Sequence, residues 1–165
     1  MYGLYYSREP SRYISGENEE QEKVKMTVPV LTEINLQDGF DGKANRQMNK
    51  KMCFYLGGKH QANPPTPTDP SVKIYKPDKE MTVYVQTFGG YATQGINLKQ
   101  AKKFAKRLNR VGEKVDRDHF YTASYDDPMK STNRRNEVMF LVPISAPRWV
   151  DDFINAHNYN NYNYN

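Results

Sequence analysis

Hydrophobic and polar positions follow their clearest pattern in the second half of the chain. Residues 119–125 carry aromatic and β-branched side chains, and residues 137–142 form an apolar run of buried-strand length. Between them, Asp126-Asp127-Pro128 has turn chemistry, because Pro128 fixes its own φ and disfavours a helical conformation at Asp127. The basic segment Lys130–Arg135 follows. The pattern predicts an antiparallel strand pair with a long cationic loop at one end.

A helix is predicted over residues 97–111, where apolar side chains recur at helical spacing. Asn97 is a candidate N-cap, Gln100 stands at the capping-box position, and Gly112 can close the helix. Residues 81–88 alternate between apolar and polar and predict a strand before it. The second half is therefore predicted as strand, helix, strand, strand. The apolar stripe of the helix consists of Leu98, Ala101, Ala105, Leu108 and Val111.

The first half shows a weaker version of the same pattern. Gly16 is predicted to close a helix of about two turns that starts at Pro10. Alternation over residues 24–30 predicts a half-buried strand, with Pro29 at an edge or a bulge. A polar hairpin loop over residues 35–49 separates it from further strands. Those are predicted around Met52, Phe54 and Leu56, and over residues 72–75.

Composition limits the protein to a few classes. With 165 residues, one domain with a substantial core is expected. Lys and Arg number 24 against 19 Asp and Glu, so the formal net charge is +5, which suits an anionic ligand. The outer face of the predicted helix is basic. It lacks an aromatic stacking platform, so we interpret it as a solvated face and expect no nucleic acid.

Candidate chemistry is sparse. Cys53 is the one cysteine, which excludes an internal disulfide and a Cys-based zinc site. His60, His119 and His157 lack metal-ligand spacing, and His119 fits a sheet residue better than an iron ligand. No nucleophile motif or phosphate loop is present. No apolar run spans a membrane and no signal peptide is visible. We predict a non-enzymatic, cytoplasmic protein, although a secreted protein without disulfides also fits.

Several blocks in order, YISGENEEQEKVKMTVPV, VYVQTFGGYA and YTASYDDPMKSTNRRNEVMFLV, resemble the SOUL haem-binding protein family from about Arg12 to Val142. The resemblance implies an α+β fold, a distorted antiparallel β-barrel with two helices built from two β-α-β-β halves. Relatives carry several tens of residues before the block matching Tyr13-Ile14-Ser15-Gly16. The first half is therefore expected to lack its opening strand. Residues 1–143 would form this domain, and 144–165 a short helix and a disordered Asn/Tyr-rich tail.

The resemblance also implies a ligand. Relatives bind haem or a related tetrapyrrole without covalent attachment, in an apolar cleft with basic residues for the propionates, as carriers or buffers. Carried over by position, the cations are Arg12 and Lys130. Met129 would form an apolar wall, and Tyr13 or Tyr125 could pack on the ring. The alternative interpretation makes Arg12 and Lys130 ordinary surface cations.

A second function class remains open. The same fold resembles effector-binding domains that take other small ligands, and some relatives act through protein partners. The segment that corresponds to such a partner surface is Asp127–Val142. The chain is thus either a haem-binding protein or an interaction module without haem.

Overall fold

The computed structural model of the chain describes residues 3–6, 10–37, 39–41, 48–76 and 81–143. The predicted C-terminal helix and tail, residues 144–165, lie outside this part of the chain. The described elements are β1 (Gly3–Tyr6), α1 (Pro10–Ile14), β2 (Val30–Leu36), η1 (Gly39–Asp41), β3 (Met48–Tyr55), η2 (Gly58–Gln61), β4 (Val72–Tyr75), β5 (Val83–Phe88), α2 (Gln94–Arg110), β6 (His119–Ser124) and β7 (Asn136–Leu141).

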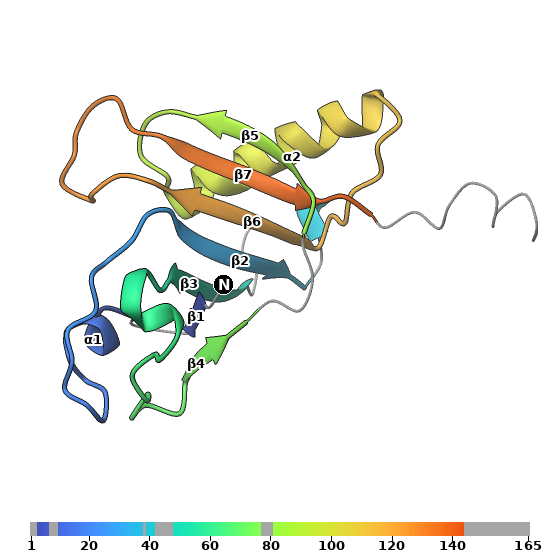
Figure 1. Cartoon of the computed structure of the whole chain (residues 1–165). Helices are drawn as coiled ribbons and strands as arrows, with labels where there is room; N and C mark the ends of the chain where they lie inside the picture. The colour runs from blue at the N-terminus through green and yellow to red at the C-terminus, as the bar shows by residue number, and fades with distance from the viewer. Residues whose placement is uncertain (1–2, 7–9, 38, 42–47, 77–80, 144–165) are drawn as a thin grey trace, which may run out of the picture.

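All described strands belong to one antiparallel sheet of seven strands, in the order β4-β1-β3-β2-β6-β7-β5 (Figure 1). Two copies of one pattern make up this order. In the first half β1 pairs with β3 and β3 with β2, and in the second half β5 pairs with β7 and β7 with β6. The β2–β6 pair joins the halves. The predicted α+β class, the two helices and the antiparallel β-α-β-β halves are therefore confirmed.

The expected loss of the opening strand is wrong. Residues Gly3–Tyr6 form β1, which pairs with β3 on one side and β4 on the other. β1 is only four residues long, too short for alternation to reveal it, and tertiary pairing defines it instead. β1 covers this edge of β3, and β4 occupies the end of the sheet.

Two element boundaries differ from prediction because of local chemistry. The strand predicted over residues 24–30 begins only at Val30, after Pro29, which has no N–H to donate to a ladder. Met26 and Val28, predicted to be half-buried, are exposed. Val24 is buried, but its N–H donates to the Ile14 carbonyl at 2.9 Å rather than to a strand.

Helix α2 begins three residues earlier than predicted. Thr93, not Asn97, is the N-cap, and its hydroxyl accepts a hydrogen bond from the Ile96 N–H at 3.3 Å. Asn97 lies inside the helix and donates to the Ala92 carbonyl at 3.4 Å. Val111, assigned to the apolar stripe, lies beyond the helix and is 73% exposed. Phe104 takes the central buried position instead.

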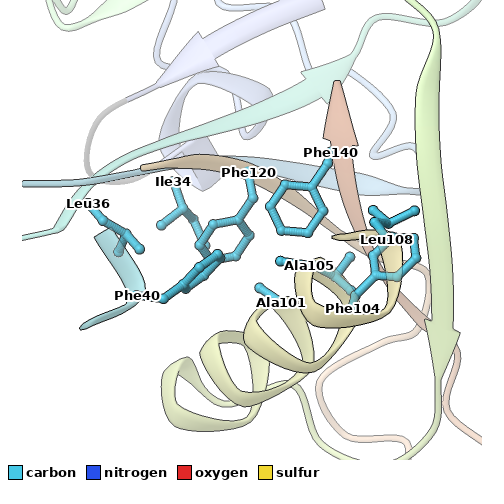
Figure 2. Packing of buried hydrophobic residues seen from close by; sticks show 10 residues of the cluster. Ile34, Leu36, Phe40, Ala101, Phe104, Ala105, Leu108, Phe120 and Phe140 are labelled. Atoms are coloured by element: carbon cyan, nitrogen blue, oxygen red, sulfur yellow. The ribbon is translucent and has the colours of Figure 1, made fainter. Parts of the chain in front are cut away.

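The larger hydrophobic cluster lies where α2 packs against the second half of the sheet (Figure 2). Phe140 of β7 sits at its centre, with ring centroids 6.1 Å from Phe40, 5.8 Å from Phe104 and 6.1 Å from Phe120. Tilted and edge-on contacts at these distances are the favourable aromatic geometries. The buried members are Ile34, Leu36, Phe40, Ala101, Phe104, Ala105, Leu108, Phe120, Val138 and Phe140.

A second cluster packs α1 against the first half of the sheet. It contains Tyr13, Val24, Phe54, Leu56 and Val72. Strand alternation, together with the pairing of β3 with β2 and of β2 with β6, places Phe54 on the same sheet face as the α2 cluster. Both helices therefore cover one face of the sheet.

The opposite face curves inward. Ala123 and Met139 point to it and are buried, although neither helix covers it. The pKa of Tyr121 is raised to about 12, chiefly by burial and then by Glu33, Cys53 and Tyr75. On a flat sheet Tyr75 of β4 would lie about 19 Å from β6, beyond effective electrostatic range. The sheet is thus curled. Among the described strands β4 and β5 are not paired, so closure into a barrel stays a prediction.

Candidate functional site

A groove of about 240 Å³ opens on the helix-bearing face, between the α1 cluster and the start of α2. Its floor is formed by alternate residues of β3, β2 and β6, which point to this face because side chains alternate along a strand. The strand residues are Val30, Thr32, Ile34, Met48, Lys50, Met52, Phe120, Thr122 and Ser124, and the segment at the start of α2 adds Ala92, Gln94, Asn97 and Leu98. Seven of these thirteen residues are apolar, among them two methionines, which adapt to irregular ligands.

Polar groups stand at defined points of this groove. The Lys50 ammonium donates to the Gln94 side-chain oxygen at 2.6 Å, which ties β3 to the start of α2. The Asn97 Oδ1 atom is buried and has no hydrogen-bond partner among the described residues. The groove thus combines apolar and polar side chains with one cation, Lys50.

The β6–β7 loop begins at the end of this groove, directly after Ser124, and its fold is fixed by Asp126. One Asp126 oxygen accepts from the Lys130 ammonium and the other from the Arg135 N–H, both at 2.5 Å. Arg134 donates to the carbonyl oxygens of Asp127 and Lys130, at 2.8 and 2.6 Å. These contacts hold the loop in one shape. Met129 stands at its tip with 88% of its surface exposed.

The Arg134 guanidinium also lies 4.8 Å from the ring centroid of Tyr91. Tyr91 lies three residues before the first residue of α2, so this cation–π contact couples the loop to the segment that lines the groove. The loop and the α2 side of the groove are thereby positioned together.

We expect Asp126→Asn to lower Tm at pH 7 and to have no effect in strong acid. The Lys130 hydrogen bond, followed by that of the Arg135 N–H, holds the pKa of Asp126 below its ordinary value. A carboxyl with a lowered folded-state pKa stabilises the fold above the unfolded-state pKa, and this contribution disappears as pH falls through the folded-state pKa. Thermal melts of parent and variant at pH 7 and pH 2 measure the difference. Lys130→Gln removes the hydrogen bond that contributes most to the lowered pKa of Asp126, so its Tm should lie closer to that of the parent at pH 2 than at pH 7. An equal difference in Tm at both pH values would contradict this account.

Tyr125 lies at the start of the β6–β7 loop and makes its contacts on the curled face of the sheet, which carries no helix. Its hydroxyl donates to Glu137 at 2.8 Å, and the Arg135 guanidinium lies 4.4 Å from its ring centroid. Arg135 and Glu137 form an ion pair at 2.6 Å. Burial, and then Glu137, raises the pKa of Tyr125. One face of this ring is therefore already covered by a cation.

The two residues expected from α1 have different environments. Arg12 is exposed and pairs with Glu17 at 2.9 Å. Tyr13 is 1% exposed, and its hydroxyl donates to the Pro65 carbonyl at 2.7 Å. Burial is the largest cause that raises its pKa to about 12. Tyr13 is thus a core residue of α1, while Arg12 reaches solvent.

The structure therefore brings Tyr125, Met129 and Lys130 together in one loop and leaves Arg12 and Tyr13 on α1 in the other half. Sequence reasoning missed the groove itself. The available signal was the alternation of Met48, Lys50 and Met52 on one strand, but β3 was predicted to start later, so this register was not seen.

Neither His60 nor His119, the histidines within the described ranges, lines the groove. His119 lies on the curled face, where its Nε2 atom is 3.0 Å from Glu33, away from the groove. Within the described ranges no group of three His, Cys, Asp or Glu side chains could hold a metal ion.

Comparison with known proteins identifies the family. Residues 8–141 match the family described as SOUL heme-binding protein. The chain belongs to the SOUL heme-binding protein family. Heme-binding protein 2 of Homo sapiens is 33% identical over 129 residues, which cover 78% of this chain and 60% of that protein. Heme-binding protein 1 of Bos taurus is 36% identical over 131 residues, covering 79% and 65%.

The chain thus spans less than two thirds of the length of these two SOUL-family relatives. No helix in the described part of this SOUL-family chain is long and apolar enough to cross a bilayer.

Proposed function

We propose that the protein binds haem or a related tetrapyrrole non-covalently in the groove on the helix-bearing face of the sheet, as a carrier or buffer without catalysis. The observation that carries the proposal is the groove itself, which combines apolar side chains with the Lys50 cation. A tetrapyrrole requires this combination, because its ring is apolar and its propionates are anionic. Family membership supports the same ligand class.

The size of the groove sets how the ligand would lie. Its volume of about 240 Å³ is below the ~300–1,000 Å³ typical of pockets that enclose a ligand. The ring would therefore be covered on one side by the sheet and would protrude toward the β6–β7 loop. Met129, exposed on that pinned loop, would cover it.

Charge completes the proposed site. Lys130 at the loop and Arg12 on α1, the two positions carried over from the family, would meet the propionates. Both cations now pair with carboxylates, Lys130 with Asp126 and Arg12 with Glu17, so a propionate would compete with an existing partner. Lys50 is a further cation within the groove lining.

Non-covalent attachment and a cytoplasmic location are part of the proposal. Cys53 lies on the curled face of β3, opposite the groove. Its thiol therefore cannot form a thioether bond with a ligand held in the groove. A single half-buried cysteine also suits a reducing compartment, and we propose a cytoplasmic location.

A haemin titration followed through the Soret band tests the site. We expect Lys130→Ala to weaken affinity by less than about tenfold, because a half-exposed ion pair is worth only ~0.2–1 kcal/mol. The double variant Arg12→Glu, Lys130→Glu should weaken it further, because it places like charges against the propionates. His119→Ala should leave the Soret band unchanged, since that ring contacts Glu33 on the other face.

Asp126→Asn is the matched control for this titration. It breaks the same ion pair as Lys130→Ala but leaves the Lys130 cation free to meet a propionate. Affinity should therefore be retained or increased in Asp126→Asn. Parent-like affinity in the double charge reversal would move the site elsewhere, and no saturable Soret shift in the parent would reject haem binding.

A second candidate function is protein recognition without haem. The pinned loop with Met129 exposed at its tip favours it. Only part of the segment Asp127–Val142 is suited to this role, because β7 lies between β6 and β5 and its side chains are mostly buried. The partner surface would be residues 126–135.

A further inference from the structure

The outward face of α2 carries a continuous stripe of cations. Lys99, Lys103, Lys106 and Arg110 follow one another at intervals of four, three and four residues, which places them on one side of the helix. All four side chains are exposed. With a rise of 1.5 Å per residue, the stripe is about 16 Å long. The helix contains no Asp or Glu.

These four charges are not compensated. None of the hydrogen bonds or ion pairs within the described part of the chain involves them. The other two cations of α2 differ, because Arg107 donates to Gln86 at 2.9 Å and Lys102 to the Phe40 carbonyl at 3.5 Å. Like charges three and four residues apart destabilise a helix. The sequence therefore keeps an unfavourable arrangement on a surface that the fold does not use.

The composition of the stripe selects among anionic partners. Three of its four residues are lysines, which protein–protein interfaces tend to exclude, and no aromatic or aliphatic anchor lies between them. The helix has one aromatic residue, Phe104, and it is buried, so nucleobases have no platform to stack on. Lysine acts as a point charge toward a diffuse field of phosphates.

We propose that the α2 stripe, Lys99, Lys103, Lys106 and Arg110, binds the surface of a membrane that contains anionic phospholipids. A straight row of charges on the outside of a helix matches a plane of phosphates better than a groove. The apolar side of α2 is already packed against the sheet through Ala101, Phe104 and Leu108, so the helix adsorbs to the lipid headgroups without inserting. Binding is therefore electrostatic and is weakened by salt. This inference stands apart from haem binding, because none of the stripe residues lines the groove.

Sedimentation with lipid vesicles tests it, using phosphatidylcholine alone and phosphatidylcholine with phosphatidylserine. The stripe variant is Lys99→Gln, Lys103→Gln, Lys106→Gln, and glutamine keeps the helix propensity. The matched control, Lys23→Gln, Lys25→Gln, Lys73→Gln, removes the same charge from exposed positions outside α2. Each cation near an anionic surface changes affinity about fivefold, so the stripe variant should bind the anionic vesicles about 100-fold more weakly.

The control triple should lose much less, and the parent should not sediment with phosphatidylcholine alone. Raising the salt concentration should abolish parent binding to anionic vesicles. Equal losses in the two triple variants would overturn the proposal, because net charge and not the stripe would then be responsible. Parent binding to single-stranded RNA or to an acidic protein, without binding to anionic vesicles, would overturn it in favour of a different partner. Thermal melts confirm that each variant is folded at the assay temperature.

Discussion

Phe140→Ala is expected to lower the free energy of unfolding by about 3–5 kcal/mol, the largest loss that we predict for any single substitution in this chain. Phe140 is fully buried and its ring contacts those of Phe40, Phe104 and Phe120. Its removal leaves a cavity between β7, α2 and η1 that these rigid rings cannot close. The loss would be a large fraction of the ~5–15 kcal/mol that separates folded from unfolded states of typical domains.

Urea unfolding followed by circular dichroism measures this loss. Phe140→Leu is the graded control, because it keeps most of the apolar volume and should cost about half as much or less. Val85→Ala, on an exposed part of the neighbouring strand β5, should cost far less. A loss below about 1 kcal/mol for Phe140→Ala would mean that the cluster can repack around the missing ring.

Met52→Trp should have the largest effect on ligand binding. Met52 lines the groove, and a tryptophan there would occupy the space that we assign to the tetrapyrrole ring. If the bulk prevents burial of about 100 Å² of the ring, the loss is about 2.5 kcal/mol, or 50–100-fold in haemin affinity.

Tyr55→Trp is the matched control for Met52→Trp. The two residues belong to the same strand and are almost equally exposed, 37% and 38%, but they point to opposite faces of the sheet. The control should bind haemin like the parent. Equal affinities in both variants would show that the ligand does not use the groove, even if the protein binds haem elsewhere.

The second half of the fold was predictable because its patterns are long and local. Strands β6 and β7 and helix α2 each contain enough periodic apolar positions to define their type, and the largest boundary error was at the helix start, where Thr93 and not Asn97 is the N-cap. The first half was less predictable because pairing between distant segments defines it. β1 has only four residues. The residues before Pro29 alternate between apolar and polar in the sequence, but they do not belong to strand β2.

The candidate site divides in a similar way. The loop residues Tyr125, Met129 and Lys130 lie close together because they are close in sequence. A prediction that located one of them therefore located all three. The groove floor combines residues about 90 positions apart, such as Ile34 beside Phe120, and no local pattern reveals that juxtaposition. The engagement of Tyr13 with Pro65 is also a long-range contact, so its burial could not be inferred from the five-residue helix that carries it.

The groove draws its walls from both β-α-β-β halves, with β2 and β3 on one side and β6 and α2 on the other. A molecule held there would contact the two halves at once and would have no comparable site on an unfolded chain. By mass action its binding free energy adds to the folding free energy, by about 2.7 kcal/mol when the free ligand is at 100 times its Kd. At the β2–β6 junction of the halves, a rise in free ligand concentration would therefore raise the free energy of unfolding of the whole domain.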